Sequence, residues 1–466
     1  MQQELISRLN KIVGDKWVIT DPKEVVNYAS EHTMDSYELV SPRPVGDCVV
    51  VKPVNSKEVS EILKLANETG TPVVPKGGKT ALAAAAIPLE PSIIISDERM
   101  NKIHQIDEQN LSVTCEPAVT LGDLVKEMKK HDRLFFPLHP GDEGAHVGGM
   151  VSMNAGGVRA VRYGVMRDQV LGMEVVLPNG EIVNFGGSDG KLLKDNAGYD
   201  LKQLLIGSEG TLGFITRVVL KLIPEPKARA ILLISYKERS SAFSSVPALI
   251  QAGVIPQAVE YVERDQIETT AGDLGKEWPV HDEGKCDLIA FMAEEDEQTL
   301  YDKSEIVQQT CENYGALDIL VAESNREQQS ILDIRSHVLP SVEKDIVDMP
   351  DVTVPRSNLA GLIDKIDKLS DKYSTRIPIL AHAGDGNLHV FILKEDGQKP
   401  GYFEDLKAEI YTAALELGGT ITGEHGIGYL RKDELENQLT RTEYEIMKQV
   451  KKAFDPNGIF NPGKFV

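Results

Sequence analysis

The chain has 466 residues, enough for two or three domains and a large buried core. Hydrophobic residues make up 41% of the chain and charged residues 26%, a composition that excludes a disordered polyelectrolyte. Fifty Lys and Arg against 72 Asp and Glu give a net charge of −22, and the basic residues do not cluster. Nucleic acid and anionic membrane surfaces are therefore not expected partners.

The cysteines and the N-terminus indicate a cytoplasmic protein. No two cysteines form a CxxC pair or a spacing suited to zinc or an iron–sulfur cluster, so reduced thiols are expected. Residues 1–17 have the pattern of an amphipathic helix without the apolar core of a signal peptide, and the uncharged stretch 81–89 is too short to span a bilayer. We expect no export and no membrane insertion.

The first regular elements in chain order form an α/β unit. A buried strand is expected over 48–53, followed by a helix that Ser56 caps and Gly70 ends. Short strands over 72–74 and 92–96 flank a glycine-rich turn. Strand, helix and strand in succession predict an α/β subdomain.

A second unit begins near Ser112 and contains the most glycine-dense part of the chain, over 139–164 and 207–216. Two prolines within 223–228 indicate a domain boundary. Short β-like runs then alternate with helical patterns, as in an α+β domain with a mostly antiparallel sheet, and the chain is helical after residue 403.

The segment Lys76-Gly77-Gly78-Lys79-Thr80 follows a strand. Neither a GxGxxG fingerprint nor a Walker A motif is present, so a Rossmann site and a P-loop are not supported. Backbone N–H groups in such a turn can nevertheless bind a pyrophosphate. A tight turn without a ligand explains the segment equally well.

The stretch from Pro140 to Gly157 has six glycines in 18 positions. Each costs roughly 0.5 to 1 kcal/mol relative to Ala in regular structure, so stability alone does not favour them. Close approach of the backbone to a large flat ligand is the expected reason, and a flexible loop is the alternative.

The motif HAGDGNLH, residues 382–389, lies between two apolar runs. Asp385-Gly386 predicts a two-residue hairpin turn. His382 and His389 would then be directly opposite on one face, with Cβ atoms about 4.5 to 5.5 Å apart, and could bind a metal ion. The alternative is two surface histidines beside a turn.

The motif GTITGEHGIG, residues 419–428, places Glu424 and His425 on a glycine-rich turn. Glu424 can join the two histidines on a divalent ion while His425 faces a substrate. Two His and one carboxylate with open positions form the ligand set of a catalytic metal. A helix cap with Glu424 in the first turn is the alternative.

Seven motifs occur in the order typical of one family. PKGGKT, the glycine stretch 139–164, GSEGTLGFIT, DVTVPR, HAGDGNLH, GTITGEHGIG and DPNGIFNPGK together resemble the FAD-linked D-2-hydroxy acid dehydrogenases, the glycolate oxidase catalytic subunit and D-lactate dehydrogenase group of the vanillyl-alcohol-oxidase-type flavoproteins. The resemblance covers residues 20–466.

The resemblance implies an α+β fold in three parts. An FAD-binding domain of two α/β subdomains would span 1–222, a ferredoxin-like antiparallel-sheet cap domain 223–410, and a helical segment that returns to the FAD domain 411–466. Covalent members have a His after the paired glycines, where this chain has Lys79, so non-covalent FAD is expected. By the same resemblance the cofactor is held by Lys76, Gly77, Gly78, Lys79, Thr80, Ala81, Pro140, Gly141, Asp142, Gly144, Ala145, Gly148, Gly149, Ser152, Asn154, Gly156, Glu209, Gly210, Ile215 and Asn461.

The family also implies a mechanism. A divalent ion (Zn, Fe or Mn) on His382, His389 and Glu424 would bind the substrate hydroxyl and carboxylate, and His425 would remove the hydroxyl proton while hydride passes to the flavin N5. Arg335 would bind the substrate carboxylate, and Asn387 would support the site.

The resemblance also limits which substrate and which electron acceptor are expected. Relatives acting on dicarboxylates have a Lys before the DVTVP-like strand, where this chain has Met349 and Pro350, so D-lactate is favoured and glycolate is next. Electrons would go to a separate electron-transferring flavoprotein or an iron–sulfur subunit. Direct use of dioxygen, a non-catalytic flavin electron-transfer subunit and a metal hydrolase are the alternatives, and the hydrolase would leave the glycine stretches unexplained.

Overall fold

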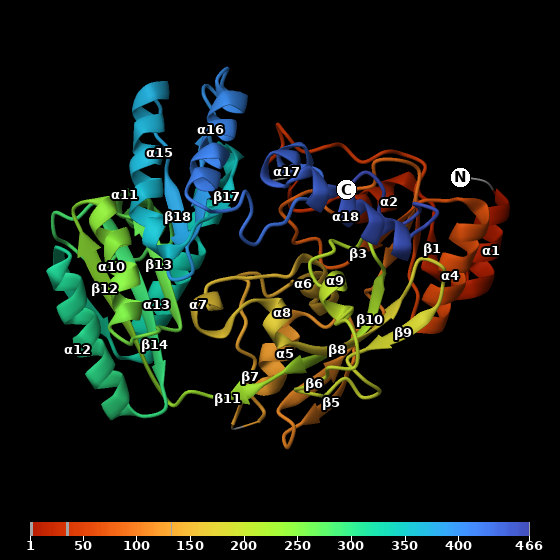
Figure 1. The fold of residues 1–466 in the computed structure, drawn as a ribbon, viewed down its shortest axis with the longest axis horizontal. Coiled ribbons are helices and arrows are strands. Elements are labelled where there is room, and N and C mark those ends of the chain that lie inside the picture. Colours follow the sequence, from red (N-terminus) through yellow and green to blue (C-terminus); the bar gives the residue numbers. More distant parts are fainter. Residues whose placement is uncertain (1–2, 34–36, 132, 466) are drawn as a thin grey trace. The chain divides into compact units, whose positions relative to one another are not determined.

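The computed structural model describes residues 3–33, 37–131 and 133–465, in two compact units. The first unit consists of Met1–Ala155, Val165–Glu225 and Glu424–Val466, and the second of Gly156–Gly164 and Pro226–Gly423. Each unit has its own sheets and helices (Figure 1).

This division differs from the sequence-based one in three places. Residues 223–225, expected in the cap domain, belong to the first unit, where Ile223 pairs with Phe135. Gly156–Gly164, expected in the first domain, and residues 411–423, expected in the C-terminal segment, both belong to the second unit. Local contacts explain this. Arg162 forms an ion pair with Glu294 at 3.1 Å, and Thr420 pairs with Thr353.

The first unit contains a four-stranded sheet in the order β1-β2-β4-β3, in which β2, β4 and β3 are parallel. Helix α4 covers it, with Val59, Ile62 and Leu63 in the core. The helix is capped by Asn55, whose side chain accepts from the Glu58 N–H, and not by Ser56 as expected; Gly70 ends it at φ +61°. The elements here are α1 (Gln3–Val13), β1 (Val18–Ile19), α2 (Pro22–Ala29), β2 (Val49–Val51), α4 (Ser56–Thr69), β3 (Val73–Lys76) and β4 (Ile93–Ser96).

A second sheet of this unit has the order β5-β6-β10-β8-β9 and is antiparallel throughout. It begins at Ile103, before the expected start near Ser112. The C-terminal tail returns to the first sheet, where Val73 bridges Phe460. The elements are β5 (Ile103–Asp107), β6 (Ser112–Cys115), α5 (Leu121–Met128), β7 (Leu134–Phe135), α6 (Val147–Met153), α8 (Met166–Gln169), β8 (Val170–Val176), β9 (Ile182–Phe185), α9 (Lys202–Leu205), β10 (Phe214–Lys221), β11 (Ile223–Pro224), α17 (Lys432–Gln438) and α18 (Arg441–Phe454).

The second unit is built on a seven-stranded antiparallel sheet in the order β15-β12-β14-β13-β18-β19-β17. Helix α10 packs between α12 and α15, and α15 packs on α16. Helices α11, α13 and α14 form another group beside β13. The elements are α7 (Ala160–Tyr163), β12 (Ala228–Tyr236), α10 (Arg239–Gln251), β13 (Ala258–Glu263), α11 (Arg264–Asp273), β14 (Cys286–Glu294), α12 (Glu297–Asn313), β15 (Ala316–Ala322), α13 (Asn325–Ser336), α14 (Val338–Val342), β16 (Ile346–Asp348), β17 (Asp351–Thr353), α15 (Leu359–Tyr373), β18 (Ile379–His382), β19 (Asn387–Val390), β20 (Ile392–Leu393) and α16 (Phe403–Glu416).

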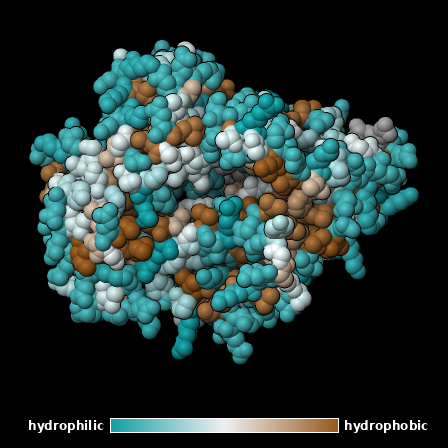
Figure 2. Space-filling model, viewed as in Figure 1, coloured by the Kyte–Doolittle hydropathy of each residue, from teal (hydrophilic) through white to brown (hydrophobic). Residues whose placement is uncertain are grey.

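The surface drawn in Figure 2 is mainly hydrophilic, with hydrophobic residues in separate groups. Among the residues that the structure describes, no helix combines the length and the apolar character needed to cross a membrane.

Candidate functional site

Strands β18 and β19 place two buried imidazoles on one face of the second unit's sheet. His382 pairs with Asn387, and His389 pairs with Leu380. Because residues 387 and 389 point to the same face, the imidazoles are diagonal neighbours, with ring centroids 5.2 Å apart and planes at 88°.

The expected hairpin register is therefore wrong, although both histidines face the same side. The loop has four residues, 383–386, because the N–H groups of Asp385 and Gly386 both donate to the His382 carbonyl at 3.2 Å. Gly386 has φ +92°, and a Cβ there would collide with the Val354 carbonyl oxygen. This packing fixes the loop and shifts the strand pairing by two residues.

Glu260, on the neighbouring strand β13, binds the Nδ1 atom of His382. Its carboxylate lies 2.8 Å from His382 Nδ1 and forms an ion pair with Arg335. Burial alone would raise the pKa of Glu260, but the charges of His382 and Arg335 lower it below its ordinary value. Because Glu260 binds Nδ1, His382 would bind a metal ion through Nε2.

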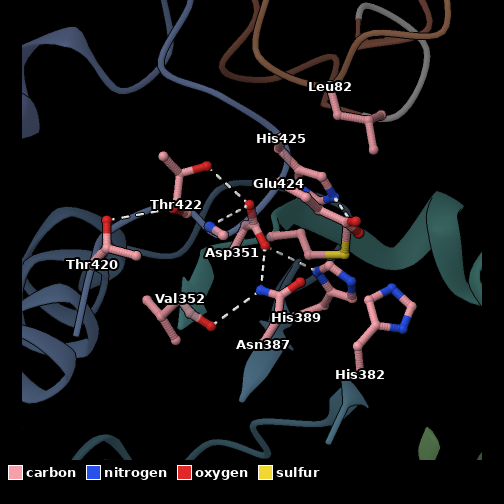
Figure 3. Close-up of polar contacts among 12 residues, drawn as sticks. Leu82, Asp351, Val352, His382, Asn387, His389, Thr420, Thr422, Glu424 and His425 are labelled. Atoms are coloured by element: carbon pink, nitrogen blue, oxygen red, sulfur yellow. Dashed lines mark hydrogen bonds and ion pairs between the residues drawn. The ribbon is translucent and has the colours of Figure 1, made fainter. Parts of the chain in front are cut away.

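Asp351, at the start of β17, organises the other side of the cluster. Its carboxylate accepts from Asn387 Nδ2 at 2.6 Å and from Thr422 Oγ1 at 2.9 Å, and lies 3.5 Å from His389 Nδ1 (Figure 3). It also accepts from the Gly423 N–H at 3.0 Å. Asp351 thereby fixes the residue that directly precedes Glu424.

The expected metal ligands come together. Single ligand atoms of His382, His389 and Glu424 all lie within 4.8 Å of one another, and Asp351, His389 and His425 form a second such group (Figure 3). His425 Nε2 is 4.0 Å from Glu424 Oε1, and these side chains are 8% and 17% exposed. Borderline N and O donors of this kind suit Zn, Fe or Mn, so the residues fit a divalent cation.

The sequence-based interpretation missed Glu260 and Asp351. Both are acidic residues in short apolar strand patterns (AVEYVE and DVTV), where a buried charge needs a partner. That signal was available, but nothing in the sequence indicated which partner each would find.

The expected cofactor segments of the first unit also converge. A Cβ on Gly78 would lie 2.7 Å from the Gly144 carbonyl oxygen, and Gly210 packs equally tightly on Pro75. The Glu209 N–H donates to the Ser152 carbonyl at 2.7 Å. Segments 76–81, 140–154 and 209–210 are therefore neighbours, and Asn461 joins them through a 2.9 Å hydrogen bond to the Glu209 carbonyl.

Two features of this region fit a phosphate-bearing cofactor. Within the described part of the chain, no protein oxygen accepts a hydrogen bond from the backbone N–H groups of residues 77–81. Such consecutive free donors form an anion-binding turn. Five of the ten described non-glycine residues with positive φ also lie in or beside these segments, which indicates strain at a functional site; they are Lys79, Ala84, Asn154, Glu209 and Asn461.

The side chains of Lys76 and Lys79 bind backbone carbonyls of other segments. Lys76 is buried, donates to the Ser30 carbonyl at 2.6 Å, and has a pKa lowered by burial to about 8. Lys79 donates to the Asn27 carbonyl and lies over the Tyr28 ring. Anion binding at the turn would thus depend on backbone N–H groups.

The remaining residues that were expected to hold the cofactor lie in several parts of the structure. Asp142 accepts from the Gly144 N–H at 2.7 Å, and Ser152 Oγ donates to the Gly148 carbonyl at 2.8 Å. Ile215 packs in the core of the second sheet, and Gly156 belongs to the other unit. The others lie in the segments already described: Thr80, Ala81, Pro140, Gly141, Ala145 and Gly149.

Comparison with known proteins yields two family matches. Residues 225–465 match the C-terminal domain of FAD linked oxidases, and residues 48–186 match an FAD binding domain. A D-lactate dehydrogenase of Archaeoglobus fulgidus is 38% identical, covering 92% of this chain and 93% of the relative. The glycolate oxidase subunit GlcD of Bacillus subtilis is 36% identical, with 89% and 88% covered.

The fold is shared with solved flavoproteins. The 4-ethylphenol oxidase of Gulosibacter chungangensis superposes with a TM-score of 0.75 at 19% identity, over 99% of this chain and 96% of that one. The predicted α+β fold of the vanillyl-alcohol-oxidase type is thereby confirmed.

Proposed function

Since the chain belongs to the family of FAD-linked oxidases, we propose that it oxidises a small D-2-hydroxy acid to the 2-oxo acid. D-lactate is the first candidate and glycolate the second, because relatives that cover most of the chain have the corresponding names. The observation that carries the proposal is the cluster of His382, His389 and Glu424, with His425 beside it.

The cofactor would be FAD, bound without a covalent link and held by the turn of residues 77–81 and the glycine stretch of residues 140–154. A divalent cation would be held by His382, His389 and Glu424. When bound, FAD supplies an acceptor for the substrate's hydride, and the cation favours ionisation of the hydroxyl group.

Residues of the chain would supply the base, bind the substrate carboxylate and support the site. His425 Nε2, near Glu424, would take the hydroxyl proton as the general base. Arg335 pairs with Glu260 through Nη2 only, which leaves other guanidinium N–H groups for the substrate carboxylate. Asn387 holds Asp351, and through it the turn before Glu424.

We further propose that the electrons pass to a separate protein, either an electron-transferring flavoprotein or an iron–sulfur subunit. The four cysteines support this, because each is buried and distant in sequence from the others. Direct reaction with dioxygen is the alternative, and rapid aerobic turnover by the purified chain alone would favour it.

The test is anaerobic mixing of the purified yellow protein with D-lactate, L-lactate, glycolate or D-2-hydroxyglutarate. Loss of flavin absorbance within the mixing time is expected with D-lactate, more slowly with glycolate, and not with L-lactate. A colourless protein, or flavin that none of the four acids reduces, would contradict the proposal.

A further inference from the structure

Glu209 uses both carboxylate oxygens on the turn that follows His425. Oε1 accepts from the Ile427 N–H at 2.7 Å, and Oε2 accepts from the Gly428 N–H at 2.6 Å. The residue is 5% exposed. Paired acceptors this close to two backbone donors fix both the position and the direction of the turn.

The backbone of Glu209 is itself fixed. Its N–H donates to the Ser152 carbonyl at 2.7 Å, and its carbonyl accepts from Asn461 Nδ2 at 2.9 Å. Its φ of +53° is one that non-glycine residues rarely adopt, and Gly210 packs against Pro75 directly after it. The backbone that carries the Glu209 carboxylate is therefore held in place by these contacts.

The turn packs closely against Met153 and Glu209 at Gly426. A Cβ on Gly426 would lie 2.6 Å from Met153 Cε and 2.8 Å from Glu209 Oε1. Three residues further on, the Tyr429 N–H donates to the Ala83 carbonyl at 2.9 Å. The chain just after His425 is thus held by Glu209 on one side and by Ala83 on the other.

The segment that contains Glu424 and His425 is held at its N-terminal end by a second buried carboxylate, that of Asp351. Asp351 accepts from the Gly423 N–H through Oδ2 at 3.0 Å and through its own carbonyl at 2.8 Å. Only three residues, Glu424, His425 and Gly426, separate this anchor from Ile427. We call residues 424–426 the bridge segment.

We propose that Glu209 is a positioning residue, whose carboxylate sets the place of Glu424 and His425 by fixing the end of the bridge segment. This rests on the functions proposed above for Glu424 and His425. Three residues between two anchors have few conformations, so releasing one anchor lets both side chains move. The carboxylate of Glu209 is committed to the turn and not to the cofactor.

The test compares Glu209→Gln with the wild type and with Glu181→Gln, a control at an exposed carboxylate. Gln keeps the shape of the side chain but replaces one acceptor oxygen with an NH₂ group that faces a backbone N–H. We expect cation affinity, measured by titrating Mn²⁺ into metal-stripped protein, to fall about 10- to 100-fold, as for other residues that orient ligands. The affinity of the apoprotein for FAD should stay within about threefold, and Glu181→Gln should match the wild type in both titrations.

Two further variants keep the test decisive. Glu209→Asp, one methylene shorter, retains the charge but cannot reach both N–H groups, and replaces Glu209→Gln if that variant does not fold. Glu424→Gln tests the ligand assignment itself: if it binds Mn²⁺ like the wild type, the proposed metal site fails. If Glu424→Gln loses Mn²⁺ while the Glu209 variant retains it, or if the Glu209 variant loses FAD instead, the positioning role is overturned.

Discussion

Replacing Glu260 with Gln should loosen the cation site and destabilise the second unit. The carboxylate is fully buried, binds His382 Nδ1 at 2.8 Å and balances the charge of Arg335. Without that charge, Arg335 is left as a buried cation with no ion-pair partner, and His382 loses the acceptor that sets its tautomer.

The size of the effect follows from these contacts. Removing one member of a buried ion pair costs about 3 to 5 kcal/mol when the other charge is left alone, and Gln, which retains a hydrogen-bond acceptor, should cost about 2 to 3 kcal/mol. Loss of the residue that orients a metal-binding histidine weakens cation binding about 10- to 100-fold. The Arg335 side chain is 13% exposed, so solvent can stabilise little of its charge.

The assay pairs urea unfolding with Mn²⁺ titration of metal-stripped protein. Glu263→Gln is a matched control, because Glu263 lies on the same strand, is buried, and pairs with Arg239 and Arg376 away from the imidazoles. Both variants should lose stability, but only Glu260→Gln should lose cation affinity. Equal Mn²⁺ affinity in the two variants would refute the assigned role of Glu260.

Other substitutions, and the pH dependence of stability, test the functions assigned to His425, Glu209 and the loop at Gly386. His425→Ala should retain FAD and cation yet reduce its flavin at least 100-fold more slowly in anaerobic stopped flow, whereas His389→Ala should also lose cation; normal reduction by the first variant would exclude His425 as the base. Burial raises the pKa of Glu209 from 4.5 to about 7, so the folded chain binds more protons than the unfolded chain between these values. The free energy of unfolding should therefore fall by roughly 3 kcal/mol as pH rises from 4.5 to 7, and Glu209→Gln should lack this slope; equal slopes in chemical denaturation would contradict the assignment. Gly386→Ala should cost at least about 1 kcal/mol and weaken Mn²⁺ binding, because the loop between the histidines must move; an unchanged melting temperature would show that the loop is not constrained as described.

Much of the fold was predictable because local patterns and packing agree. The strand expected over 48–53 is present over Val49–Val51, as apolar periodicity predicts, and the helix ends at Gly70, which adopts a left-handed conformation. The helix cap was misplaced by one residue because Asn55 and Ser56 are both good caps, and the sequence does not decide between them.

The sequence predicted that His382, His389 and Glu424 would lie close together, but it did not predict their geometry or the contacts of Glu260 and Asp351. The register of the 382–389 hairpin depends on where Gly386 packs against Val354, which directly follows β17 and lies more than thirty residues away in sequence. Likewise, Glu260 lies over a hundred residues from His382, and only the pairing of β13 with β18 brings them together. Long-range pairing of this kind leaves no local signal in a single sequence.

The central claim is that His382, His389 and Glu424 bind one divalent cation. Anomalous diffraction from crystals grown with Zn²⁺ or Mn²⁺ tests this most directly. We expect a single strong peak about 2.0 to 2.2 Å from His382 Nε2, a nitrogen of His389 and a Glu424 oxygen. A peak held by other side chains, or no peak in crystals whose flavin D-lactate still reduces, would contradict it.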